Sequence, residues 1–215
     1  VGGWVEEPFV EAKLTERDAL IWSENDVERF IAGQDAYYEL EINALGTVTL
    51  DGVVLDDDAV IVPADPAALD DALLRIAALA IAADAVGGGE RALSGTIEYM
   101  NVRQQFDRVI GSFQALKHRV ADHQTALVAA RGLVEHAASL DPGDPQALLM
   151  ALSAKQHAVR TVAEIARDCI QLHGGVGFTA EFFPHIYLKR AKVNEAIHGT
   201  RAVLLDRIAE MLEAA

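Results

Sequence analysis

The pattern of apolar and polar residues changes once along the chain, at the Pro-Ala-Asp-Pro sequence of residues 63–66. Before it, segments such as residues 37–42 place aromatic and β-branched side chains at a period near two, which is typical of strands. After it, the apolar period is close to 3.6 residues, which predicts helices. The chain therefore divides into a β-strand segment, residues 1–62, and a helical segment, residues 67–215.

Start and stop signals divide the helical segment into five helices. The first is expected at about residues 68–100, and Gly87-Gly-Gly89 within it predicts a kink or a close contact, because glycine in a helix costs about 1 kcal/mol relative to alanine. Ser112 is the expected N-cap of the second helix, and Asp144 caps the third, with Pro145 at its first position. The remaining bounds are expected at about residues 113–140, 145–173, 184–197 and 200–215. Long helices with short connections predict a mainly α protein, an antiparallel helix bundle with a short N-terminal β segment.

Charge is distributed unevenly between the two segments. Residues 1–70 carry 17 acidic and 3 basic side chains, whereas residues 71–215 carry 16 acidic and 15 basic ones. Such an asymmetry suggests two parts with different histories. Neither part has the basic stripe of a nucleic-acid-binding protein, so we expect no nucleic-acid partner.

The sequence shows no sign of membrane insertion, export or metal binding. Charged residues interrupt every apolar run before the roughly 18 residues of a bilayer span, and the first residues lack the basic and apolar regions of a signal peptide. Cys169 is the single cysteine, so it forms no internal disulfide, and we expect a buried, unreactive thiol. His118 and His123 are five residues apart rather than four, so no helical metal pair is expected. These features predict a cytoplasmic protein.

Three separated stretches carry the candidate chemistry. The first is Arg103-Gln-Gln-Phe-Asp-Arg-Val-Ile-Gly-Ser-Phe-Gln114, and the second is Gln171-Leu-His-Gly-Gly-Val-Gly-Phe178. The third is Arg190-Ala-Lys192 followed by Gly199-Thr200. Glycines just past a helix end take backbone angles closed to other residues and let a ligand approach closely. Each stretch alone also fits an ordinary helix end, turn or packed core.

Together, in this order and spacing, the three stretches resemble the C-terminal helical domain of the acyl-CoA dehydrogenases over about residues 47–215. The first resembles the family's Arg-x-x-Phe-Gly-x-x-Ile-x-x-Phe-Gln segment, and the second its Gln-x-x-Gly-Gly-x-Gly loop. The third resembles the Arg-Asp-Ala-Lys segment that ends in Glu-Gly-Thr. The resemblance implies FAD as cofactor and a flavoprotein oxidoreductase of fatty acid or steroid side-chain degradation.

The resemblance also implies a role for each matching position of the first stretch. Arg103 would meet the FAD pyrophosphate, since a planar guanidinium suits phosphate oxygens. Gln105 would hydrogen-bond nearby, and Phe106 would pack against the adenosine part. Phe113 and Gln114 would line the same cleft.

The other two stretches imply assembly. Gln171, Gly174 and Gly175 would contact the FAD of a neighbouring subunit, and Thr200 would contact the diphosphate region. We therefore expect a homo- or hetero-oligomer built through the helical bundle. The three stretches are expected to converge at one edge of that bundle.

The chain departs from the family at the catalytic base, a glutamate that removes the substrate's α-proton while FAD takes a hydride from the β-carbon. Its commonest position is occupied by His198, and the alternative position is Ala77, beside Ala78 where the family has an arginine. Asp107 replaces a usual glycine. Histidine can act as a base near neutral pH, so His198 is the candidate catalytic residue, although a replacement without catalytic role is the preferred interpretation. The prediction is thus a subunit that is non-catalytic or needs a partner chain to act on an acyl-CoA.

Residues 1–46 support two alternatives. They are similar to part of a family-nine-like carbohydrate-binding β-sandwich, in which Trp4 and Trp22 would be sugar-stacking or core residues. The match covers about 45 residues and lacks the second sheet that a sandwich needs. The alternative functions are a carbohydrate-binding fragment, or a structural chimera joined near Gly46 in which no ligand site survives.

Overall fold

The computed structural model describes residues 63–179 and 182–213. The described residues from Asp65 onward belong to one compact unit, Asp65–Ala215. The strands expected within residues 1–62, and the carbohydrate-binding hypothesis that depends on them, lie outside the described residues.

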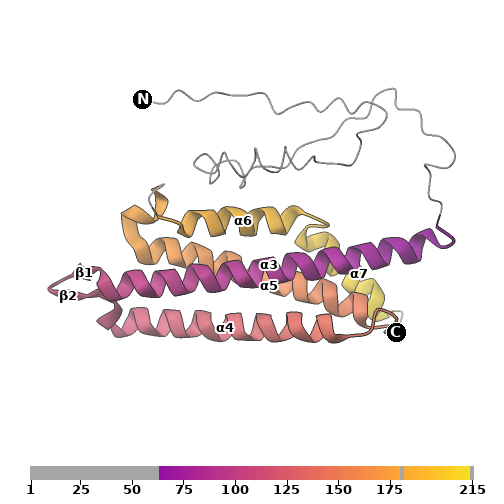
Figure 1. The fold of residues 1–215 in the computed structure, drawn as a ribbon, viewed down its shortest axis with the longest axis horizontal. Coiled ribbons are helices and arrows are strands. Elements are labelled where there is room, and N and C mark those ends of the chain that lie inside the picture. Colours follow the sequence, from indigo (N-terminus) through magenta and orange to yellow (C-terminus); the bar gives the residue numbers. More distant parts are fainter. Residues whose placement is uncertain (1–62, 180–181, 214–215) are drawn as a thin grey trace, which may run out of the picture. The chain divides into compact units, whose positions relative to one another are not determined.

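Five helices make up most of the described chain (Figure 1). They are α3 (Pro66–Val102), α4 (Gln114–Ser139), α5 (Ala147–His173), α6 (Pro184–Ala196) and α7 (Arg201–Glu213). The connections contain an antiparallel pair of short strands, β1 (Gln104–Gln105) and β2 (Arg108–Val109), and two 3-10 helices, η3 (Ile110–Ser112) and η4 (Gly174–Phe178). Helices α3 to α6 run alternately in opposite directions, which confirms the predicted antiparallel bundle (Figure 1).

The start of α3 follows the sequence signal. Asp65 is its N-cap, and the Asp65 carboxylate accepts a hydrogen bond of 3.0 Å from the backbone N–H of Ala68. Pro66 occupies the first turn, where its missing N–H costs nothing.

The expected starts of the next two helices are wrong. Phe113, not Ser112, is the N-cap of α4, because the Ser112 hydroxyl donates 2.7 Å to the carbonyl of Val109 instead. The Asp144 carboxylate accepts 2.7 Å from the N–H two residues on, which closes a turn, and α5 begins only at Ala147. In both cases a short polar side chain bonds to nearby backbone that lies outside the helix.

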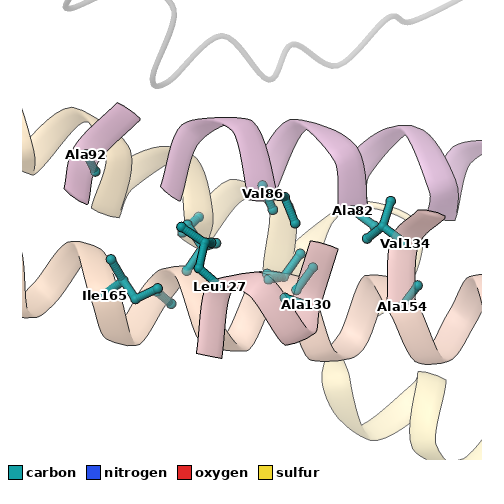
Figure 2. Packing of buried hydrophobic residues seen from close by; sticks show 14 of the residues in the cluster. Ala82, Val86, Ala92, Leu127, Ala130, Val134, Ala154 and Ile165 are labelled. Atoms are coloured by element: carbon teal, nitrogen blue, oxygen red, sulfur yellow. The ribbon is translucent and has the colours of Figure 1, made fainter. Parts of the chain in front are cut away.

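A row of small buried residues, here called the α3 seam, packs α3 into the bundle. Its members are spaced alternately four and three residues apart, and all of them are buried: Ala78, Ala82, Ala85, Gly89, Ala92 and Thr96. This 3.5-residue period is that of helices that pack at a shallow left-handed angle. Small side chains let the axes approach closely, and α3 makes its most extensive contacts with α5. Figure 2 shows Ala82, Val86 and Ala92 of α3 beside residues of α4 and α5.

The three consecutive glycines of α3 provide close contact rather than a kink, since α3 is continuous through them. A Cβ atom on Gly89 would lie 2.7 Å from the Cγ2 atom of Val162 in α5. A Cβ on Gly88 would lie 3.4 Å from the Tyr187 ring in α6, whereas one on Gly87 would meet nothing within 4 Å. Of these three glycines, only Gly89 is therefore sterically required by the described chain.

Of the described helices, α3 is the one long and apolar enough, by length and composition, to cross a bilayer. A core helix gives the same signal, so this is weak evidence for a membrane span. Helix α3 contacts α4, α5 and α6, and 28% of its apolar window is buried in the described structure.

Replacing Gly89 and Gly87 separately by alanine tests the seam. Both changes add helix propensity of about 1 kcal/mol, but the new methyl group at position 89 overpacks the α3–α5 contact, which typically costs about 1–3 kcal/mol. In urea denaturation, Gly87→Ala should be more stable than the wild type, and Gly89→Ala should be about 1–3 kcal/mol less stable than Gly87→Ala. Equal stabilisation by both substitutions would contradict the seam.

Candidate functional site

The first motif stretch folds into the hairpin that ends α3. The Arg103 N–H donates 2.9 Å to the Tyr99 carbonyl, and the Arg103 carbonyl accepts 2.8 Å from the Ile110 N–H. The two turn residues between β1 and β2, Phe106 and Asp107, have φ angles of +54° and +60°. Two successive left-handed residues are the pattern of a type I′ hairpin turn. An aromatic residue in that conformation carries strain of about 1–3 kcal/mol, which is typical of functional sites.

Side chains of the hairpin leave an exposed, incompletely paired surface. The Phe106 ring is 86% exposed, and its centroid lies 6.1 Å from that of Phe113 in an edge-to-face arrangement. The Arg108 guanidinium stacks 3.9 Å from the Phe113 centroid. Arg103 and Gln105 are exposed, and no described residue forms a hydrogen bond or ion pair with the Arg103 guanidinium. A free guanidinium thus lies close in the chain to an uncovered aromatic ring.

The glycines of the second stretch differ in what they do. Gly174 ends α5 with φ +66°, which favours glycine, and a Cβ on Gly177 would lie 2.6 Å from the Ile170 carbonyl. Gly175 is exposed and has neither a positive φ nor any atom within 4 Å of an added Cβ. Gly175 therefore leaves open space at the loop surface.

A buried histidine, His173, directly precedes this loop at the end of α5. His173 is 4% exposed, and its Nδ1 lies 2.8 Å from the Cys169 carbonyl, which assigns the ring proton to Nδ1. The His173 ring stacks on that of Tyr99 at 4.3 Å, and the Tyr99 hydroxyl donates 3.3 Å to the His173 carbonyl. Burial lowers the pKa of His173 and raises the pKa of the Cys169 thiol to about 11. The expected burial of Cys169 is confirmed.

The third stretch is divided between two elements: Arg190-Ala-Lys192 lies within α6, and Gly199-Thr200 lies in the connection between α6 and α7, residues 197–200. His198 has φ +52° and is exposed, and Gly199 has φ +104°. Lys155 of α5 donates hydrogen bonds to the carbonyls of Ile197 and Gly199, the second at 2.9 Å. Thr200 is exposed at the start of α7.

Only two of the three stretches meet within one chain. The Tyr99–His173 contacts bring the hairpin end of α3 to the glycine loop at the end of α5. Lys155, which holds the third stretch, precedes His173 by 18 residues of helix, or about 27 Å at 1.5 Å per residue. Within one chain, the expected convergence of all three at one edge is therefore not found, because α6 runs back along the bundle to α7, which Thr200 directly precedes (Figure 1).

A polar cluster between α4 and α5 was missed by sequence reasoning. Asp168 accepts hydrogen bonds from Arg119, at 3.2 Å from its Nε, and lies 2.8 Å from Nε2 of His123. A cavity of about 450 Å³ beside it is lined by Arg119, Asp122, His123, Glu164, Arg167, Asp168 and Gln171. These residues are about 45 positions apart in sequence, so no local motif marks them. Within the described ranges, no group of three or more candidate ligands is arranged to hold a metal ion.

Lys155 was missed as well, although a signal existed. It occupies an apolar stripe position of α5, between Leu152 and Val159, which are both buried. A lysine in such a stripe is unusual, because charged side chains are rarely fully buried without a partner.

The fold is that of the C-terminal helical domain of acyl-CoA dehydrogenases. The glutaryl-coenzyme A dehydrogenase in its glutaryl-CoA complex matches with a TM-score of 0.69 and 26% identity, over 77% of this chain and 42% of that one. A steroid acyl-CoA dehydrogenase, the G363A variant of Tcur3481-Tcur3483, matches with a TM-score of 0.61 and 28% identity, over 66% and 39%.

The sequence agrees with the fold. Residues 69–213 match the family model "Acyl-CoA dehydrogenase, C-terminal domain", and the chain belongs to this family. It is 40% identical over 148 residues to acyl-CoA dehydrogenase IpdE2 of Mycobacterium tuberculosis, covering 69% of this chain and 43% of that protein. The chain thus spans less than half the length of this relative. The chimera hypothesis is not borne out by these matches.

The lowered pKa of His173 predicts a pH-dependent contribution to stability. Below pH 6.5, the ordinary pKa of histidine, the imidazole of the unfolded chain binds a proton while the buried ring of the folded chain stays neutral. Lowering the pH towards the lowered pKa of the folded state therefore favours unfolding. The melting temperature should therefore fall more steeply between pH 7.5 and 5.5 in the wild type than in His173→Gln. Parallel curves for the two proteins would show that burial does not hold His173 neutral.

Proposed function

We propose that this chain is an FAD-binding subunit or domain of an acyl-CoA dehydrogenase, which holds FAD at a subunit interface and lacks its own catalytic glutamate. The observation that carries the proposal is the meeting of the hairpin and the glycine loop at one end of the bundle. Both stretches resemble the family's cofactor motifs, and the Tyr99–His173 contacts join them.

The residues at this end fit a dinucleotide. The unpaired guanidinium of Arg103 can donate two parallel hydrogen bonds to pyrophosphate oxygens. The exposed ring of Phe106 offers an apolar surface for an adenosine, with Phe113 beside it. The open surface at Gly175 lets a ligand approach the backbone. Bound FAD would supply the hydride acceptor, and these side chains would bind and orient it.

The separation of Thr200 from the other two stretches supports assembly. The two ends of the bundle that carry these stretches are about 27 Å apart along α5. A cofactor diphosphate bound at one end therefore cannot also be contacted from the other end of the same chain. The two ends would therefore serve different cofactor sites, each completed by another subunit. Exposed apolar side chains such as Phe106 and Phe178 favour such burial between subunits.

The chain offers no carboxylate at either family position for the base. His198 is exposed and has no described partner, and Ala77 carries no ionisable group. Ala78 beside it is fully buried in the α3 seam, where a charged side chain would be costly. A partner chain would supply the base for α,β-dehydrogenation of an acyl-CoA from fatty acid or steroid side-chain degradation. We place this activity in the cytoplasm, with neither membrane nor nucleic acid as a partner.

Flavin binding by the full chain tests the proposal. The wild type, alone or copurified with a partner acyl-CoA dehydrogenase chain, should retain FAD absorbance, and its melting temperature should rise with added FAD. Arg103→Met removes a charged hydrogen-bond donor worth about 1.5–3 kcal/mol, so FAD affinity should fall at least about tenfold. Arg131→Met, at an exposed ion pair between α4 and Glu90 of α3, is the matched control and should bind FAD normally.

The same preparations give the native mass, which should be that of a dimer or larger assembly. A colourless protein without any FAD-dependent rise in melting temperature, both alone and with the partner chain, would rule out the proposed function.

A further inference from the structure

Lys155 is the most deeply buried charged side chain among the described residues, at 1% exposure. Its ammonium group forms no described ion pair, and its hydrogen bonds go to two backbone carbonyls, those of Ile197 and Gly199. These two carbonyls flank a single residue, His198. The lysine thus holds the chain on both sides of the position that precedes the Gly-Thr pair.

The burial of Lys155 does not increase the general stability of the bundle. Burying an ammonium group without a counter-charge costs several kcal/mol, which two carbonyl acceptors offset only in part. Desolvation accordingly lowers the pKa of Lys155. An apolar residue would fill this stripe of α5 more favourably, so general stability does not explain a lysine here.

The lysine instead satisfies the end of a helix. Ile197 is the C-cap of α6, and its N–H donates 3.1 Å to the Val193 carbonyl. Its own carbonyl belongs to the last turn, where helical carbonyls lack partners and a positive charge is favourable. Lys155 provides both the donor and the charge.

The loop that Lys155 holds has a strained backbone conformation, which needs support from the surrounding residues. His198 and Gly199 are both left-handed, and at His198 this conformation is strained because of the side chain. A Cβ on Gly199 would also lie 3.1 Å from Leu204, which is buried at the start of α7. A cavity of about 80 Å³ lies beside Lys155, between α5 and the ends of α6 and α7 that flank the loop.

We infer that Lys155 is a positioning residue, which clamps the carbonyls of Ile197 and Gly199 and so fixes the direction in which His198 and Thr200 face. The clamp itself depends only on the contacts of this chain. Its consequence for the cofactor rests on the proposed function, in which Thr200 contacts the FAD diphosphate.

The test compares Lys155→Met with Lys189→Met in hydrogen–deuterium exchange of the full chain. Methionine keeps the apolar stem and removes the donors, while Lys189 is exposed on α6 and serves as the control. In Lys155→Met, the amides of Ile197 and Leu204, which bond at the two borders of the loop, should exchange at least tenfold faster. Amides in the middle of α5 should exchange at the wild-type rate, and the melting temperature should stay at or above the wild-type value, which a merely structural role would not allow.

FAD affinity provides the second readout. If the wild type binds FAD, Lys155→Met should bind it at least fivefold more weakly, and Lys189→Met should bind it normally. Unchanged loop exchange in Lys155→Met overturns the clamp. Faster loop exchange with unchanged FAD affinity overturns its role towards the cofactor. A wild type that binds no FAD refutes the proposed function, while the exchange comparison still decides the clamp.

A measurement on the wild type covers the case in which Lys155→Met does not fold. With ¹⁵N-lysine, the clamped ammonium should give a slowly exchanging NH₃⁺ signal with nuclear Overhauser contacts to Gly199. A rapidly exchanging ammonium without such contacts would refute the clamp.

Discussion

The close approach of α3 to its neighbours through the α3 seam is the constraint on which the other features depend. Because the seam consists of alanine, glycine and threonine, the helices interlock at short distance and their relative register is fixed. That register brings Tyr99 of α3 onto His173 of α5. The hairpin and the glycine loop, about 70 residues apart in sequence, therefore meet because of packing in the middle of the bundle rather than contacts of their own.

The central helix α5 then carries a support for a loop at each end. His173 lies beneath the glycine loop as a buried neutral ring, and Lys155 holds the connection between α6 and α7 as a buried ammonium. Both groups are costly to bury, and both bond to backbone carbonyls. A rigid helix that positions two surface loops suits a bundle whose ends would serve different cofactor sites.

Local signals predicted the elements, whereas tertiary contacts decided the site. Asp65 caps α3 within the Pro-Ala-Asp-Pro sequence that predicted a helix start, and Gly174 ends α5, because a cap and a left-handed glycine act within a few residues. Ser112 failed as a cap because the chain before α4 offered its hydroxyl a nearer acceptor. The direction of α6, and with it the separation of Thr200 from the glycine loop, depends on packing, and motif spacing contains no information about it. In the sequence, Lys155 could be recognised only as a charged residue in an apolar stripe. The two carbonyls that it binds could not be recognised there.

The loop at residues 198–200 has more structural support than the exposed side chain of His198 requires. A histidine at position 198 that served only to fill space would gain nothing from a strained left-handed backbone, and α6 could end without a buried lysine. The clamp acts on main-chain atoms, so it operates whatever side chain occupies position 198. The geometry of the loop is therefore separable from the identity of the base. This separation is physically consistent with a subunit that positions Thr200 for a cofactor while another chain supplies the carboxylate.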